Sequence, residues 1–157
     1  MIQVMLKKTQ NYKVIARSAA VLFLLGLLTG IYVTFVAIGQ IDGNLGASVA
    51  AHLNGIIGAL IILSLHLILP IIKFDHLYKV NMIRLFILAN YSNWFLTLVK
   101  SFLDVDGLEI IQKSLANNVI HIALVMLAVI PSLVGGGMWV FGIGILNNGK
   151  SQDKLKI

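Results

Sequence analysis

The chain has 157 residues, of which 59% are hydrophobic and 11% charged, and its formal net charge is +6. This composition is far more apolar than that of a soluble domain, so we predict an integral membrane protein. The absence of cysteine excludes disulfides, thiolate metal sites and cysteine nucleophiles. Most basic residues lie at the ends of apolar runs, where lipid headgroups account for them, so the bilayer and not nucleic acid is the expected partner.

Four apolar runs are each long enough to cross about 30 Å of hydrocarbon as a helix. We place these helices at about residues 17–39, 47–73, 79–103 and 119–146. No repeat or shift in composition divides the chain, so residues 1–157 are expected to form a single membrane domain, an all-α four-helix bundle. Lys and Arg gather in the N-terminal segment, the second connection and the tail, so both termini are predicted to be cytoplasmic, in a bacterial inner membrane.

The first expected helix follows a basic stretch and carries Gly26 and Gly30 one turn apart. Its apolar core is longer than that of a signal peptide, and no clear cleavage site follows it, so we keep it as a membrane helix. Small residues at this spacing allow two helices to approach closely. Gly55 in the second helix is expected to support the same kind of contact.

The second expected helix carries His52 among small and apolar neighbours, with no acid nearby in the sequence. A polar side chain in hydrocarbon is costly unless it is paired or lines a cavity, so His52 is a candidate metal ligand. The alternative is a structural histidine bonded to a neighbouring helix. His66 lies 14 residues further on the same face, a spacing typical of two-haem cytochromes b. The residue 14 after His121 is Gly135, however, so at most one bis-His haem, on His52 and His121, is expected.

The third expected helix carries Asn90, Asn93 and Thr97 at i, i+3 and i+7, with Trp94 beside them. With cytoplasmic termini, this stripe and His52 fall at one depth in the outer half of the membrane. Polar groups that converge at one depth predict a site. The alternative is that they only bridge helices, for about 0.6 kcal/mol each.

The fourth expected helix begins close to His121, which therefore also falls in the outer half of the membrane and has an interfacial position as its alternative. Further along it stand Gly135, Gly136 and Gly137. Three bare positions in a row fit a helix contact, a flat wall beside a planar cofactor or a flexible point, and the sequence does not choose among these.

Two segments and a proline carry a family resemblance. They are Ala51-His52-Leu53-Asn54-Gly55, Pro70 and Tyr91-Ser92-Asn93-Trp94-Phe95-Leu96-Thr97-Leu98. They resemble the small four-helix membrane isomerases that include styrene oxide isomerase and hydroxylaminobenzene mutase. The spaced His, Asn-Gly, Pro and Trp-Ser-Asn of the epoxide isomerases fall, without gaps, on His52, Gly58-Ala59, Pro70 and Tyr91-Ser92-Asn93. The resemblance covers about residues 50–98, a third of the chain.

The resemblance implies a homotrimer that binds haem b between subunits, with His52 as the axial iron ligand and Asn54, Gly55 and Trp94 beside the cofactor. Ferric iron then acts as a Lewis acid, and the enzyme is an isomerase or mutase that rearranges its substrate without net redox change. The substrate implied is a small apolar oxygenated molecule, like an aromatic epoxide or hydroxylamine.

Asn93 and Thr97 are expected to hydrogen-bond this substrate, with Asn90 behind them. Epoxide isomerases have an Asn and a Tyr where this chain has Gly58 and Thr97, so we expect a substrate other than styrene oxide. Two alternatives remain: a single-haem electron carrier and a haem-free structural or accessory membrane protein.

Overall fold

The computed structural model describes residues 2–112 and 114–144, all of them in helices or short connections. Its helices are α1 (Ile2–Ala37), α2 (Leu45–Ile68), α3 (His76–Phe102), α4 (Leu115–Leu124), the π-helical turn η1 (Val125–Val129) and α5 (Ile130–Gly142). The last three form one continuous span. Four helices are therefore long and apolar enough to cross a membrane, which confirms the all-α membrane fold.

The helices begin and end where local chemistry requires. Asn44 caps α2 by accepting a hydrogen bond from the Ala47 backbone N–H at 2.9 Å. Helix α2 ends at Ile68 and not near residue 73, because Pro70 cannot continue a helix. Helix α1 begins at Ile2, well before the predicted residue 17. That prediction followed the apolar run, whereas the good helix formers before it extend the helix beyond the hydrocarbon.

The fourth span contains an irregularity that the sequence analysis missed. Its middle turn, η1, is π-helical, and Pro131 stands directly after the first residue of α5. Proline has no N–H to donate and clashes with the carbonyl one turn earlier, and a π turn relieves both problems. The span also begins at Leu115, earlier than the predicted residue 119, and the predicted end at residue 146 lies outside the described residues.

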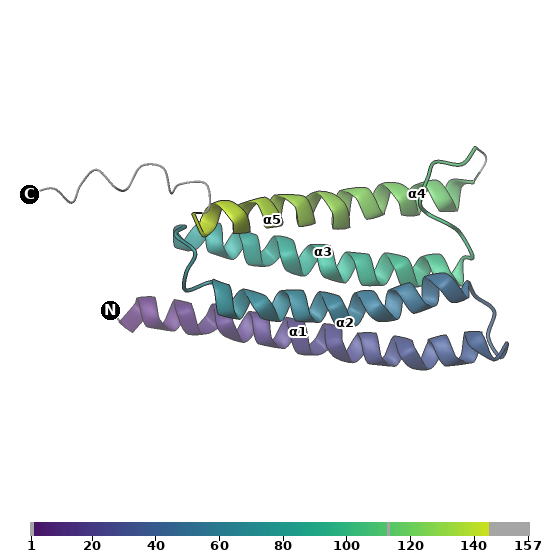
Figure 1. The fold of residues 1–157 in the computed structure, drawn as a ribbon, viewed down its shortest axis with the longest axis horizontal. Coiled ribbons are helices and arrows are strands. Elements are labelled where there is room, and N and C mark those ends of the chain that lie inside the picture. Colours follow the sequence, from purple (N-terminus) through teal and green to yellow (C-terminus); the bar gives the residue numbers. More distant parts are fainter. Residues whose placement is uncertain (1, 113, 145–157) are drawn as a thin grey trace, which may run out of the picture.

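The helices lie side by side in the order α1, α2, α3 and α4–α5 (Figure 1). Helix α1 packs along α2, α3 packs on α2 and also contacts α1, and the last span packs on α3. Within the described residues, no Cα atom of α2 lies within 8 Å of a Cα atom in α4, η1 or α5. Helix α2 and the last span therefore make no close backbone approach, and we call this side of the bundle its open side.

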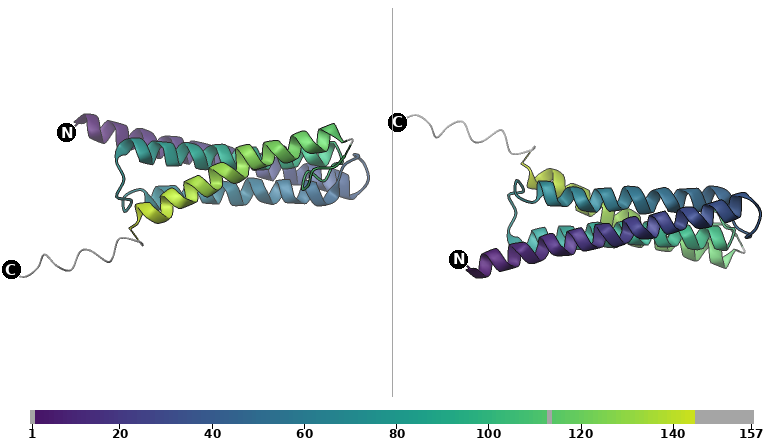
Figure 2. Two further views of the ribbon diagram at one scale, coloured as in Figure 1. Left: turned by 90° about the horizontal axis from the view of Figure 1, so that it is seen from above. Right: turned by 90° about the horizontal axis from the view of Figure 1, so that it is seen from below.

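The last span crosses α3 obliquely, so its C-terminal end approaches the connection between α2 and α3 (Figure 2). There the Lys73 backbone N–H donates to the Gly142 carbonyl at 2.8 Å. The start of α1 and the end of α5 lie at this same end of the bundle (Figure 1). Which side of the membrane this end faces remains a prediction, as does the single-domain organisation.

The buried core joins all four spans toward that end and includes Ile15, Leu22, Ile62, Met82 and Phe86. Large apolar side chains cover much of the outer surface of every span. Such a surface suits hydrocarbon, where helix contacts depend on close packing and polar bonds rather than on apolar burial.

Candidate functional site

The candidate site begins where α1 and α2 come into backbone contact. A Cβ atom placed on Gly55 would lie 2.5 Å from the Gly26 Cα, and one on Gly26 would lie 2.9 Å from the Ile56 backbone nitrogen. Only glycine fits at both positions. The Gly26-x-x-x-Gly30 segment thus forms a shallow groove on α1 into which α2 packs, as its spacing predicts.

His52 projects from α2 into the same groove, one turn along α1. A Cβ atom on Gly30 would lie 2.9 Å from the His52 Cε1 and 3.0 Å from its Nδ1, so the bare glycine makes room for the ring. The His52 Nδ1 lies 2.8 Å from the Gly26 carbonyl oxygen. A carbonyl can only accept, so Nδ1 carries a proton, and in the neutral ring Nε2 then keeps its lone pair. The imidazole is therefore fixed in position and in tautomer.

The Nε2 atom of His52 has no hydrogen-bond partner among the described residues. The same residues contain no buried side-chain nitrogen or oxygen without a partner, so Nε2 is accessible at the surface of the helix pair. A polar atom exposed to hydrocarbon is costly unless something from outside the chain pairs with it. This nitrogen is therefore available to bind a metal ion.

An apolar groove of about 320 Å³ lies along the α1–α2 surface, further toward the chain termini. Its walls include Ala59 and Leu63 of α2 and Phe23 of α1. Ala59 and Leu63 lie 7 and 11 residues after His52, and Phe23 lies 7 before Gly30, so the groove shares the face on which the His52 ring lies. An imidazole on the same face as an apolar groove suits a flat, hydrophobic, metal-bearing cofactor.

The opposite side of α2 carries a different polar pair. Asn54, about 200° around the helix from His52, donates from Nδ2 to the Thr97 hydroxyl of α3 at 3.1 Å. Thr97 is buried. The pair bridges α2 and α3, as the alternative of interhelical bonding expects, and within one chain it does not face His52.

Trp94 joins all three of the first spans. Its indole Nε1–H donates to the Thr29 hydroxyl of α1 at 3.0 Å, and that hydroxyl donates to the Leu25 carbonyl at 2.8 Å. A Cβ atom on Gly55 would lie 3.1 Å from the Trp94 Cδ1, so the indole packs directly over that glycine. Trp94 thus holds α3 against the α1–α2 contact, close to His52.

Asn90 and Asn93 point in different directions from α3. The Asn90 Nδ2 donates to the Phe86 carbonyl of its own helix at 2.8 Å, and its Oδ1 would lie 3.0 Å from a Cβ atom on Gly58. Asn93 is half-buried, with no hydrogen bond among the described residues. It is turned about 60° from Asn90, toward the side of α3 where Phe86 packs on Trp139 of α5. Asn93 therefore faces the open side between α2 and the last span.

Other sequence candidates are not brought to this site. The His52 ring faces α1, whereas His121 lies on α4, which packs on α3, so a haem between these two histidines has no support within one chain. The His66 ring packs on Tyr12 with centroids 4.5 Å apart. Gly135 is a helix contact, because a Cβ atom there would lie 3.1 Å from the Phe86 ring, while nothing lies within 4 Å of one on Gly136 or Gly137.

Sequence reasoning missed the part of α1 that builds the site. Gly26 and Gly30 were expected only to let helices pack closely. It was not predicted that the Gly26 carbonyl accepts a hydrogen bond from His52 or that Gly30 leaves room for the His52 ring, and Thr29 was not considered. The available signal was the glycine spacing, but the register between α1 and α2 depends on tertiary packing. No group of three or more His, Asp or Glu side chains that could hold a metal ion occurs among the described residues. A metal here would need a cofactor to supply most of its ligands.

Comparison with known proteins gives one result. A family model described as styrene oxide isomerase matches residues 12–146. The search of curated proteins and the search of solved structures both find no match. The matched range includes all four membrane spans except the first residues of α1.

Proposed function

The chain belongs to the styrene oxide isomerase family, and from this premise we propose that it is a haem b-dependent membrane isomerase or mutase. Its substrate is a small apolar oxygenated molecule, such as an aromatic epoxide or arylhydroxylamine, that partitions from the bilayer. The observation that carries the proposal is His52: its Nδ1–H is held by the Gly26 carbonyl, and its Nε2 lone pair is open at an apolar face.

The residues present fit the cofactor. Histidines that bind metal almost always donate their other ring N–H to a carbonyl or carboxylate, as His52 does to Gly26. The apolar groove on the same face, which begins about 10 Å along α2 from His52, offers further contact area for a macrocycle. When bound, haem b would supply ferric iron as a Lewis acid that polarises a C–O or N–O bond. Reactant and product then contain the same atoms and electrons, so no external oxidant or reductant is needed.

The polar residues of α3 are proposed to orient the substrate oxygen. Asn93 has an uncommitted amide on the open side of the bundle, and the Thr97 hydroxyl, which accepts from Asn54, still has its own proton to donate. Asn90 fills the space beside Gly58, where the resemblance places an Asn in epoxide isomerases, so its amide replaces that group from the neighbouring helix. The amide here comes from α3, whereas the resemblance places it on the second helix of the epoxide isomerases. This difference supports a substrate other than styrene oxide.

The relative positions of these groups also support an oligomer. His52 and the Asn54–Thr97 pair lie on opposite sides of α2, so a pocket bounded by both needs a second copy of the chain. The homotrimer implied by the family resemblance would provide that copy. The bacterial inner membrane remains the proposed location.

The test is the visible absorption spectrum of the detergent-purified protein, oxidised and reduced, beside His52→Ala and His121→Ala variants. We expect a high-spin Soret band that shifts with a small nitrogen or oxygen ligand, is lost in His52→Ala and persists in His121→Ala. Turnover of epoxides and arylhydroxylamines by the wild type would then identify the substrate class. A low-spin, ligand-indifferent spectrum lost in both variants would favour an electron carrier. Absence of a Soret band after expression with ample haem would overturn the cofactor assignment.

A further inference from the structure

A second hollow lies far from His52, at the end of the bundle where the last span meets the connection between α2 and α3. It is a cavity of about 700 Å³ between α5 and the start of α3. A neighbouring hollow of about 520 Å³ shares two of its lining residues, Tyr78 and Met138. The two together form one groove along α3, which we call the α3–α5 groove.

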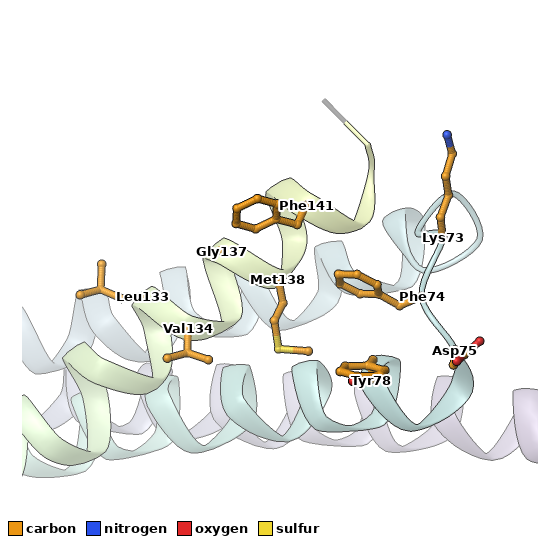
Figure 3. Close-up of a pocket in the computed structure, with 9 residues that line it drawn as sticks. All are labelled: Lys73, Phe74, Asp75, Tyr78, Leu133, Val134, Gly137, Met138 and Phe141. Carbon is orange, nitrogen blue, oxygen red and sulfur yellow. The ribbon is translucent and has the colours of Figure 1, made fainter. Parts of the chain in front are cut away.

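The walls of the α3–α5 groove are apolar near α5. In Figure 3 the Met138 side chain points toward Tyr78, with Phe74 and Phe141 closing the outer end and Leu133 and Val134 along the helix. The rings of Phe74 and Tyr78 lie 5.7 Å apart. Gly137 lines the cavity, and nothing lies within 4 Å of a Cβ atom placed on it. This part has the shape and chemistry to accept a hydrocarbon chain.

The neighbouring hollow carries the charge. Arg84 and Asn81 line it, and Arg84 is exposed, with no ion pair or hydrogen bond among the described residues. Arg84 lies about 12 Å along α3 from its first residue, His76, and a lone guanidinium within a membrane span is costly. Side chains lean toward the N-terminus of their helix, which for α3 is the surface end, so Arg84 can reach the depth of lipid phosphates.

Other charges surround the outer mouth of the groove. Lys73 and Asp75 line it, and Figure 3 shows the Lys73 amine directed away from the cavity and the Asp75 carboxylate at its outer edge. Lys79 donates to the Leu69 carbonyl at 3.1 Å. Arg84 is therefore the cation best placed to meet an anion inside the groove, and Asp75 limits how far the anion can lie toward the mouth.

From this arrangement we propose that the α3–α5 groove binds an anionic phospholipid of the surrounding bilayer. The phosphate pairs with Arg84 and Asn81, and one acyl chain lies against Met138 and Gly137. Basic pockets between membrane helices at the headgroup level are a recurrent form of lipid recognition. An apolar surface that continues from a lone cation matches an amphiphile with one negative head better than it matches a soluble anion or a protein helix.

Native mass spectrometry of the full chain, with phosphatidylglycerol or phosphatidylcholine of identical acyl chains added in detergent, tests the proposal. We expect wild type to retain phosphatidylglycerol preferentially, and Arg84→Gln to lose about fivefold in that retention, the effect of one cation near the membrane surface. Arg17→Gln is the matched control, because Arg17 is also an exposed arginine but lies on α1, outside the groove.

A second pair of variants tests the apolar part. Gly137→Leu fills the cavity, whereas Gly136→Leu adds the same side chain at an equally open position that does not line it. We expect Gly137→Leu to weaken retention of both lipids and Gly136→Leu to leave it unchanged. Equal losses in Arg84→Gln and Arg17→Gln would mean general surface attraction and would overturn the proposal. Unchanged lipid binding in Gly137→Leu would also overturn the proposal. So would a crosslink between two copies of the chain through a cysteine introduced as Met138→Cys, because a second protein chain would then occupy the groove.

Discussion

Under the proposed function, replacing Gly30 by Ala should weaken haem binding by His52 without disturbing the fold. The new Cβ atom would lie 2.9 Å from the His52 Cε1 and 3.0 Å from its Nδ1, whereas non-bonded carbon atoms settle at about 3.5–4.0 Å. The ring must therefore move by roughly 0.5–1 Å. That movement breaks its 2.8 Å hydrogen bond to the Gly26 carbonyl. Loss of such a partner lowers metal affinity by about 10–100-fold.

The assay is haem titration of the purified variant, followed by the Soret band, with circular dichroism to measure helix content. The three atoms nearest to the added one all belong to the His52 side chain, so we expect the α1–α2 backbone contact at Gly26 and Gly55 to be kept. Gly136→Ala is the control, because it makes the same change in open space. Wild-type haem affinity in Gly30→Ala, with the fold intact, would show that the orientation of His52 does not matter for the cofactor.

Three further variants separate packing from chemistry. Gly55→Ala should lower the free energy of unfolding by about 1–3 kcal/mol, because the new methyl group collides with the Gly26 backbone. The melting temperature in detergent should fall accordingly. Trp94→Phe should cost at least about 0.6 kcal/mol by the same measurement, since it removes the hydrogen bond to Thr29 and part of the ring that packs over Gly55; an unchanged melting temperature would mean that this bond contributes nothing. Asn93→Ala should reduce turnover and leave both haem content and stability unchanged; a loss of stability instead would assign Asn93 a structural role.

The sequence predicted the membrane fold because its signals are local. Hydrocarbon thickness determines span length, and a spanning backbone must satisfy its own hydrogen bonds. The end of α2 and the start of the last span were misplaced, although Pro70 marks the true end of α2. Pro131 likewise signals the π turn that precedes it. At both places the prediction followed the apolar pattern, whereas the structure is decided by the constraint that a proline imposes on the backbone.

The candidate site was less accessible from the sequence, because it depends on how helices pair. Contacts of α3 with α1 and α2 bring Trp94 and Thr97, two residues of the predicted layer, to the level of His52. Which side of α2 each residue faces could not be predicted, since the helical period gives relative angles but not the neighbouring helix. Only the packed structure separates the His52 face from the Asn54–Thr97 face.

This separation gives a test for a site that two chains share. Under the proposed function, His52→Ala removes the cofactor ligand and Asn93→Ala removes a substrate contact. If one chain supplies both residues, a mixture of the two variants contains no intact site. If His52 of one copy works with Asn93 of the next, random assembly of equal amounts restores about a quarter of the sites. We therefore expect at least about a quarter of wild-type turnover from the two variants expressed together and purified as one oligomer, none from His52→Ala alone, and only a small residual turnover from Asn93→Ala alone. Turnover no higher than the sum of the separate variants would place the whole site within one chain. In that case α2 would have to rearrange so that His52 and Asn93 of the same chain face one pocket.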